Sequence, residues 1–154
     1  MIRPLVLSIL LATPAAAQSV GDCDANTVSA RNLQEPWQDT TSSYANGDVR
    51  MAVIDTIEPA AAAVHLMILS PPRNEIGDRQ CKLVSLSQAD SGAPFGFFDI
   101  DFAARSAEYD AERGLTLRIP IEAYVPETGS GDPAELTVRI NQSTGEITAE
   151  IAGS

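Results

Sequence analysis

The stretch "LTLRIPIEAYV", residues 115–125, decides the fold class because apolar and polar side chains alternate along it. Successive side chains of a β-strand point to opposite faces, so this alternation predicts a strand with one buried and one solvated face. The residues assigned to the buried face are Leu115, Leu117, Ile119, Ile121, Ala123 and Val125, and those assigned to the solvated face are Thr116, Arg118, Glu122 and Tyr124.

The stretches on either side predict antiparallel partners for this strand. The run 95–109 leads into it through the short connection "DAERG", which predicts one long antiparallel hairpin. Farther along the chain, residues 136–140 and 147–151 alternate around the turn "NQSTGE", which predicts a second hairpin. The intervening "ETGSGDP", residues 127–133, has the composition of a loop.

The first half of the chain carries similar signals. In "YANGDV", residues 44–49, the Asn-Gly pair predicts a type I′ hairpin turn, because both residues tolerate a positive φ. Pro71 and Pro72 are expected to end a strand, since proline cannot donate to a β-ladder. Further strands are expected over residues 49–57, 63–69 and 81–86.

These patterns predict an all-β fold with at least six strands. Short connections favour neighbouring antiparallel strands, and hence a meander that packs as a small sandwich or curls into a barrel. Residues 18–43 are expected to form a short irregular or helical N-terminal segment, in which Pro36 limits any helix before it. The length of the chain fits a single β domain over residues 18–154.

The first 17 residues predict a secretory signal peptide. Arg3 supplies a short basic region, residues 5–11 an apolar region, and the three alanines at 15–17 a small-residue cleavage site. The apolar run is far shorter than the ~20 residues that span a bilayer, so we expect no membrane insertion of the mature chain. Cleavage before Gln18 would place the protein in the periplasm or outside the cell.

Cys23 and Cys81 are the two cysteines of the chain. In an oxidising compartment an even number of cysteines favours an intramolecular disulfide, with two buried free thiols as the alternative. Closure of so long a loop contributes ~4 kcal/mol to stability in the chain-entropy model. The spacing does not match the C-x-x-C motif of redox proteins.

The chain is strongly acidic, with 21 Asp and Glu residues against 10 Lys and Arg residues and a formal net charge of −11. Arg3 is the single charged residue of the signal segment, so cleavage would take the net charge to −12. Nucleic acids and anionic lipids are bound by clustered basic residues, which this sequence lacks, so we expect no nucleic-acid partner. The charge permits a cationic protein as partner, or serves solubility alone.

Signals for catalysis and for cofactor binding are weak. His65, the only histidine, lies in the apolar stretch "AAAAVHLMIL", which favours a buried strand residue over a catalytic base. One histidine and two disulfide-forming cysteines do not supply the ligands of a zinc site, and the glycine-rich stretches match no phosphate loop. We therefore expect a non-catalytic protein without metal or cofactor.

Two other places could bind a ligand or be structural. Asp99 and Asp101 in "FFDIDF" would share one strand face and could hold a cation, but an exposed strand face explains the alternation without a ligand. Trp37 could cover a pocket, whereas packing in the core is favoured by the large area that an indole buries.

Arg73 and Arg79 flank the loop "NEIGD". They could clamp an anionic ligand, or they could form surface ion pairs with Glu75 and Asp78, which is the default for exposed charges of opposite sign.

Small bacterial inhibitors of host lysozymes resemble this chain in general profile, because they are exported, disulfide-bonded β-domains. The stretch "DSG", residues 90–92, is similar to a short Ser-Gly motif in them. This resemblance covers three residues, so it implies a possible kind of partner and assigns no functional residue.

The sequence as a whole is best explained by an exported, non-catalytic binding or accessory protein. One alternative is an acidic inhibitor of a cationic protein such as a lysozyme, and another is a barrel that holds a small apolar ligand. The residues expected to contact a cationic partner are Glu108, Asp110 and Glu112, on the turn "EYDAERG", because a hairpin tip can enter a cleft of a partner.

Overall fold

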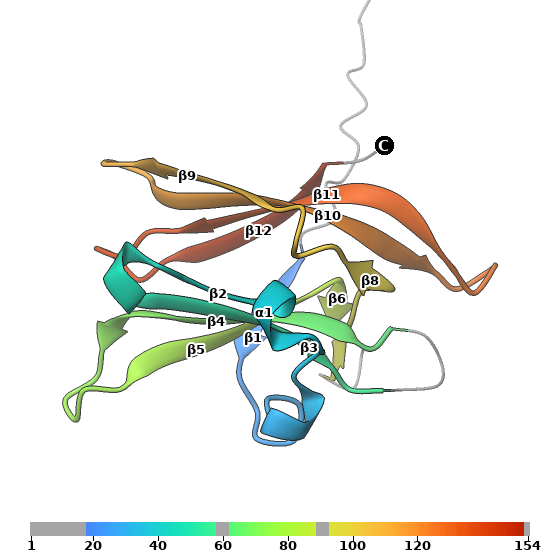
Figure 1. Cartoon of the computed structure of the whole chain (residues 1–154), viewed down its shortest axis with the longest axis horizontal. Helices are drawn as coiled ribbons and strands as arrows, with labels where there is room; N and C mark the ends of the chain where they lie inside the picture. The colour runs from blue at the N-terminus through green and yellow to red at the C-terminus, as the bar shows by residue number, and fades with distance from the viewer. Residues whose placement is uncertain (1–17, 58–61, 89–92, 153–154) are drawn as a thin grey trace, which may run out of the picture.

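The computed structural model describes residues 18–57, 62–88 and 93–152, and its strands form two antiparallel sheets stacked face to face (Figure 1). The prediction of an all-β fold is confirmed, and of the two arrangements expected the structure has the sandwich. The predicted signal peptide, residues 1–17, lies outside the described residues, as do residues 90–92. No helix within the described ranges has the length and apolarity needed to cross a membrane.

The first sheet has the strand order β1-β5-β4-β3-β2. Its strands are β1 (Ser19–Asp22), β2 (Thr41–Tyr44), β3 (Val49–Asp55), β4 (Val64–Arg73) and β5 (Arg79–Ser85). The short helical turns are η1 (Ala30–Asn32) and α1 (Trp37–Thr40), which lie between β1 and β2, and η2 (Ala45–Gly47), which joins β2 to β3.

The second sheet has the order β12-β11-β10-β8, with β9 also paired to β10. Its strands are β8 (Asp99–Ile100), β9 (Ser106–Asp110), β10 (Gly114–Val125), β11 (Ser130–Ile140) and β12 (Ile147–Ala152). A separate two-stranded ribbon is formed by β6 (Ser87–Gln88) and β7 (Pro94–Phe95).

One hydrophobic core fills the space between the sheets. The first sheet contributes alternate residues of β3 and β4, and the second sheet contributes alternate residues of β10 and β11. The assignment of faces in residues 115–125 is confirmed where the strand crosses the core, because Leu117 and Ile119 are fully buried while Arg118 is exposed. The fully buried core residues include Val49, Val53, Leu66, Ile68, Leu117, Ile119, Leu136, Val138 and Ile140.

The predicted hairpin of residues 95–109 with β10 is only partly present. The run is broken into β7, β8 and β9, and β8 and β9 pair with opposite ends of β10. Between the strands, Phe97 and Phe102 turn into the core and are almost completely buried. The strand pairing along this run is therefore interrupted, because the chain leaves the sheet edge where the two aromatic rings enter the core.

Three predicted boundaries are wrong in informative ways. Pro71 and Pro72 lie inside β4, where the register with β5 shifts between Ser70 and Arg73, so the prolines occupy an irregularity in the ladder rather than its end. The predicted loop 127–133 is shorter, since β11 already begins at Ser130.

The third wrong boundary is the Asn-Gly turn. The hairpin of β2 and β3 is confirmed, but its connection has four residues, because Tyr44 pairs with Val49. Ala45, Asn46 and Gly47 all have positive φ, which is why a glycine and an asparagine are needed here.

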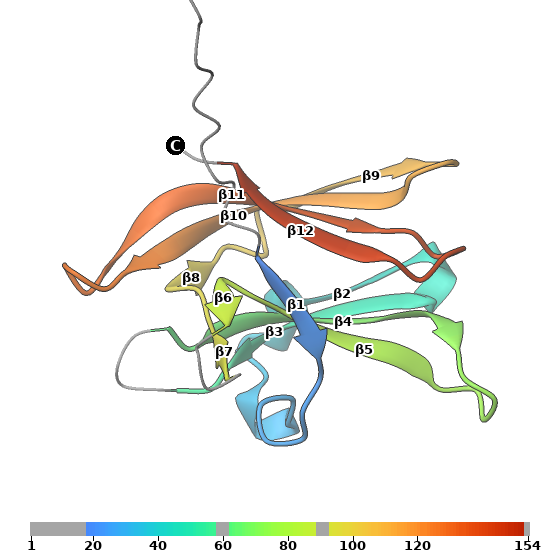
Figure 2. The same cartoon turned by 180° about the vertical axis from the view of Figure 1, so that it is seen from behind.

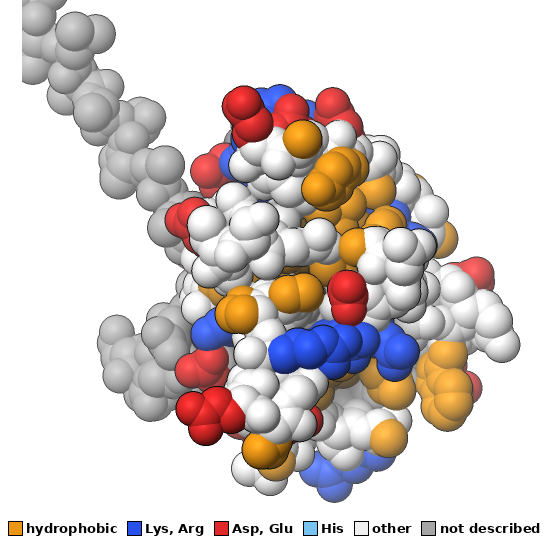
Figure 3. Space-filling view, turned by 90° about the vertical axis from the view of Figure 1, so that its left-hand side faces the viewer, with side chains coloured by type: hydrophobic (Ala, Val, Ile, Leu, Met, Phe, Trp, Pro, Cys, Tyr) orange, Lys and Arg blue, Asp and Glu red, His pale blue; other side chains and the backbone are white. Residues whose placement is uncertain are grey.

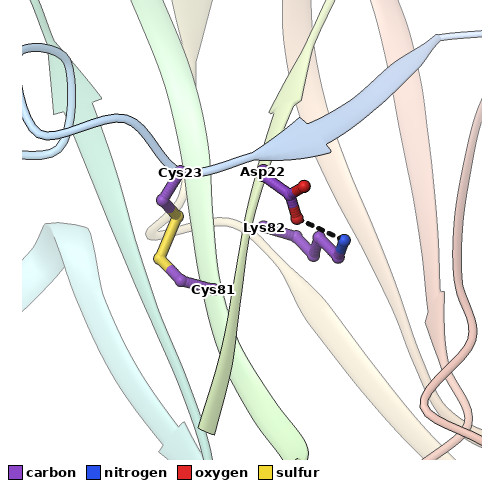
Figure 4. Close-up of a disulfide and its surroundings, with 4 residues drawn as sticks. All are labelled: Asp22, Cys23, Cys81 and Lys82. Carbon is purple, nitrogen blue, oxygen red and sulfur yellow. Dashed lines mark hydrogen bonds and ion pairs between the residues drawn. A yellow bond between two sulfur atoms is a disulfide. The ribbon is translucent and has the colours of Figure 1, made fainter.

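The predicted disulfide is confirmed between Cys23, directly after β1, and Cys81 in β5, with a Cα–Cα distance of 5.4 Å (Figure 4). The Cys23 amide donates to the Cys81 carbonyl at 3.2 Å, which continues the pairing of the two strands. Asp22 and Lys82 form an exposed ion pair of 2.6 Å beside the disulfide (Figure 4). The disulfide therefore fixes the edge strand β1 to the rest of the first sheet.

Candidate functional site

The two long sides of the sandwich, where the edges of the sheets face each other, are built differently. On one side β1 and β12 are the edge strands (Figure 2), and we call this side the closed seam. On the other side the edge strands are β2 and β9 (Figure 1), and we call this side the open seam.

The closed seam is held by a hydrogen bond that joins the two layers. The backbone N–H of Ile151 in β12 donates to the side-chain Oε1 of Gln18, just before β1, at 2.7 Å. Val20 and Ile151 are partly buried and pack against the core along this side. The edges therefore meet, and apolar side chains fill the gap between them.

The open seam contains a cleft of about 430 Å³ between the β9–β10 hairpin and the loop after β2. We call it the Tyr109 cleft. The cleft lies at the end of this side where the loop after β2, the β9–β10 turn and the β11–β12 turn come together (Figure 1). Figure 3 looks onto that end and shows hydrophobic side chains that reach the surface between acidic and basic ones. The cleft is lined by Tyr44, Ala45, Ala107, Glu108, Tyr109, Leu115 and Gln142.

The position of Tyr109 explains why the cleft is apolar. Tyr109 pairs with Leu115, and Ala107 pairs with Leu117, so both β9 residues lie on the face of the sheet that elsewhere forms the core. Leu115 and Leu117 are buried, whereas Tyr109 is 67% exposed. The aromatic ring of Tyr109 is thus left in solvent although it lies on the inner face of the second sheet.

Two polar side chains border the Tyr109 cleft. Arg105 donates from Nε to the Tyr44 hydroxyl at 2.7 Å, and its guanidinium lies 4.2 Å from the centre of the Phe102 ring. This arrangement links the two layers beside the cleft. On another wall, the Nε2 of Gln142 is buried and has no hydrogen-bond acceptor among the described residues. An unpaired buried donor of this kind is unfavourable.

The three acidic residues predicted to contact a partner lie on the β9–β10 hairpin, but they have different surroundings. Glu108 lines the cleft, and its Oε2 is 3.7 Å from Nη1 of Arg118. Asp110 caps the hairpin turn, because its Oδ1 accepts hydrogen bonds from the backbone N–H groups of Glu112 and Arg113. The hydrogen bond from the Arg113 backbone is the main cause that lowers the pKa of Asp110.

Glu112 is exposed at the tip of the hairpin and does not line the Tyr109 cleft. The structure therefore places Glu108 in the strand that borders the cleft, with its carboxylate on the outer face beside Arg118. It gives Asp110 a local structural role and leaves Glu112 at the tip of the hairpin.

His65 is buried on the outer face of the first sheet, opposite the core side of β4. Its Nδ1 lies 2.8 Å from the hydroxyl of Ser85. Desolvation by burial lowers its pKa to about 4, against the opposing influence of Asp24 and Asp55. A strand histidine with a satisfied hydrogen bond was expected, and the structure has one.

Asp99 and Asp101 are both exposed, as the expectation of a solvated strand face requires. The Oδ1 of Asp101 accepts from the backbone N–H of Ala104 at 3.1 Å, which is a local turn contact. Within residues 18–57, 62–88 and 93–152, no three His, Cys, Asp or Glu side chains are grouped so that they could hold a metal ion.

The favoured assignment of Trp37 to the core is wrong, since the residue is 53% exposed. Trp37 begins the short helix α1, and Thr40 is the residue of that helix that is buried. Thr40 donates to the carbonyl of Gln34, so a hydroxyl rather than the indole anchors this turn.

The predicted partners of Arg73 and Arg79 are also wrong. Arg73 forms an ion pair of 3.1 Å with Asp48, and Arg79 donates to the carbonyl of Gly47 at 2.9 Å. The two arginines are cross-strand neighbours, and both reach the loop between β2 and β3, although Arg73 also donates to the Gly77 carbonyl of its own hairpin at 2.9 Å. These contacts hold the loop between β2 and β3, whose first residue, Ala45, lines the Tyr109 cleft.

Sequence reasoning missed Tyr44, Tyr109 and Gln142. Tyr109 alternates in sequence with Glu108 and Asp110, which marks it as an inward residue of β9. No sequence pattern shows whether the opposite layer covers Tyr109, so its exposure could not be anticipated.

In comparisons of this chain with protein-family models, with curated proteins and with solved structures, no match is found. The function must therefore be argued from the geometry of the two seams.

Proposed function

We propose that this protein is an exported, non-catalytic binding protein that takes a segment of a cationic partner protein into the Tyr109 cleft. The observation that carries the proposal is the exposure of Tyr109, 67%, on a face that is hydrophobic core in the rest of the sheet. Exposed tyrosines in partly apolar hollows are enriched in protein–protein interfaces, where they supply large contact areas at low entropic cost.

The size and lining of the cleft support recognition of a side chain or a short segment. A volume of about 430 Å³ lies within the range of ligand-binding pockets, which is ~300–1,000 Å³. The apolar floor favours aliphatic or aromatic groups, which side chains of a polypeptide segment supply.

Charge supports a cationic partner. The chain has a formal net charge of −11, and Glu108 and Glu112 lie at or beside the cleft. Charges of this kind mainly accelerate association with a partner of opposite sign.

Export is supported by the disulfide and by the signal-like pattern of the first 17 residues. Disulfides persist in the periplasm and outside the cell and are rare in the cytosol. A folded cationic protein such as a lysozyme is one form that the partner could take. The filled interior favours recognition at the surface over an apolar ligand held inside a barrel.

The first test is selection from a display library of random peptides against the disulfide-bonded protein. Peptides rich in Lys or Arg together with apolar residues should be enriched, and their NMR shift changes should centre on Tyr44, Tyr109 and Gln142. Tyr109→Ser should weaken binding at least about tenfold, because the ring forms the exposed apolar wall of the cleft. Ile76→Ser is the matched control, since Ile76 is 83% exposed at a different hairpin tip.

Shift changes that centre elsewhere, or equal binding by the Tyr109→Ser and Ile76→Ser variants, would overturn the assignment of the cleft. A second measurement addresses charge with Glu108→Gln and Glu112→Gln together, leaving Asp110 in place as the cap of the turn. Association with lysozyme or a selected peptide should slow several-fold at low salt and by less at physiological salt, where charges are screened over ~8 Å. Glu150→Gln, on β12 at the closed seam, should change nothing.

A further inference from the structure

The edge of β9 gives the partner of the Tyr109 cleft a definite form. We propose that a segment of the partner adds to β9 as an extra antiparallel or parallel strand, with basic and apolar residues alternating along it. This inference rests on the proposed function, because it specifies the partner of the same cleft.

The backbone of β9 is available for such an addition. In the described part of the chain β9 pairs only with β10, and its residues are exposed apart from Asp110, which is partly buried. Successive N–H groups along a strand point to opposite sides, so about half of the backbone groups of β9 point away from β10. An edge of this kind is a template for strand addition.

The side chains of β9 specify what the added strand should carry. Ala107 and Tyr109 lie on the inner face beside the cleft, and Ser106, Glu108 and Asp110 lie on the outer face. Directly opposed residues on neighbouring strands have Cβ atoms ~4.5–5.5 Å apart and interact in pairs. An added strand therefore continues the inner row best with apolar residues and the outer row best with lysine or arginine.

The existing ion pair of Glu108 does not prevent this. Glu108 lies 3.7 Å from Arg118, and both side chains are about half exposed or more. Pairs of this kind contribute ~0–1 kcal/mol, so a basic residue on an added strand can share the carboxylate.

A second copy of this chain is a poor occupant for the same edge. Pairing of β9 with β9 of another molecule would bring Glu108 and Asp110 of both copies together on one face. Like charges on opposed strands are destabilising, and a net charge of −11 on each molecule adds repulsion at longer range.

The edge on the other side of the same sheet is less suitable. The backbone N–H of Ile151 in β12 already donates to Gln18, and β1 lies against this side of the sandwich. Strand addition at the closed seam would have to break this contact, whereas addition at β9 breaks none of the hydrogen bonds between described residues.

The experiment uses the whole disulfide-bonded protein and three synthetic peptides. One alternates lysine and valine, the second has the same composition in scrambled order, and the third alternates glutamate and valine. The alternating lysine peptide should bind at least about tenfold more tightly than the scrambled one, because only it satisfies both rows in register. The glutamate peptide should not bind measurably.

Amide hydrogen exchange supplies a readout that a merely electrostatic contact would not change. In the free protein, the amides of 106–110 that point away from β10 should exchange fast, and the alternating lysine peptide should protect them. Two versions of this peptide, N-methylated at one or the other set of alternate residues, should differ at least about tenfold in affinity, because only one set faces β9.

The outcomes separate this inference from the proposed function. If the two lysine peptides bind equally and perturb Tyr109 without protecting β9, strand addition is wrong and binding in the cleft stands. If the lysine peptides perturb neither Tyr109 nor β9, both proposals fall. Equal affinity of the two N-methylated peptides would also overturn strand addition.

Discussion

The closed seam and the open seam are edges of the same two sheets, yet one is sealed and the other is a cleft. At the closed seam, β1 is fixed by the Cys23–Cys81 disulfide and its neighbour Gln18 accepts a hydrogen bond from Ile151 in the opposite layer. At the open seam, Tyr109 of β9 lies on the inner face of the second sheet and remains 67% exposed.

The difference shows that the two sides contribute unequally to the fold. Burial of Val20 and Ile151 along the closed seam adds to the stability of the fold. The ring of Tyr109 is largely exposed and adds little to it, and under the proposed function this ring serves binding instead. Substitutions at the two sides should therefore separate stability from binding.

The largest effect is expected from the disulfide at the closed seam. Replacement of Cys23 and Cys81 together by serine should lower the free energy of unfolding by about 4 kcal/mol in the chain-entropy model, because the loop between them is long. Denaturant unfolding measures this loss. Lys82→Ala is the matched control, since it removes only the exposed ion pair with Asp22 beside the disulfide and should cost less than about 1 kcal/mol. A loss below that of the control would mean that the disulfide does not stabilise this seam.

The second effect concerns His65, which lies beneath the N-terminal segment that the disulfide anchors. The pKa of His65 is about 4 in the folded chain and 6.5 in the unfolded chain. Between these two pH values the unfolded chain therefore binds a proton that the folded chain does not. The contribution of His65 is thus complete above pH 6.5 and is lost as the pH falls towards 4. At about pH 5 the loss should amount to roughly 2 kcal/mol.

Comparison with His65→Gln over the same pH range isolates this effect, because glutamine can still hydrogen-bond to Ser85 and does not titrate. The variant should lose less stability than the wild type between about pH 7 and pH 5. Parallel curves for the two proteins would contradict the assignment and would leave the acid response to the carboxylates alone.

A smaller effect is expected from the hydrogen bond that joins the layers. Gln18→Ala leaves the Ile151 N–H without its acceptor and should lower the free energy of unfolding by about 1 kcal/mol. Hydrogen exchange at the Ile151 amide should accelerate as the seam frays. Ser19→Ala is the control, because it removes an exposed hydrogen bond from Ser19 to the Ser87 carbonyl of the β6–β7 ribbon and should leave Ile151 protected.

The smallest effect on stability is expected at the open seam. Tyr109→Ser should change the free energy of unfolding by less than about 0.5 kcal/mol, since the ring is largely exposed. Thermal and denaturant unfolding test this. A loss as large as that of Gln18→Ala would show that Tyr109 supports the fold, and the contrast between the seams would disappear.

The sequence predicted most of the sheet structure where local patterns decide it. Alternation from Leu115 to Ile121 identified the buried face correctly, and the turn "NQSTGE" gave the correct hairpin. The disulfide was predicted from the even cysteine count together with the expected export of the chain, and it is present. By contrast, the run 95–109 was predicted as one strand because alternation alone does not show that Phe97 and Phe102 will leave the sheet for the core.

What the sequence determined by itself is therefore the strand pattern, the faces of the strands, the disulfide and the acidic charge, because each depends on residue type and local spacing. The tertiary structure alone decided which edges meet and which stay apart. Trp37 and Tyr109 are exposed because no distant segment among the described residues covers them, and Arg73 pairs with Asp48 because the β2–β3 loop comes within its reach. Such relations between distant segments leave no trace in local periodicity. The Tyr109 cleft belongs to this second class, since its lining comes from segments that are far apart in the sequence.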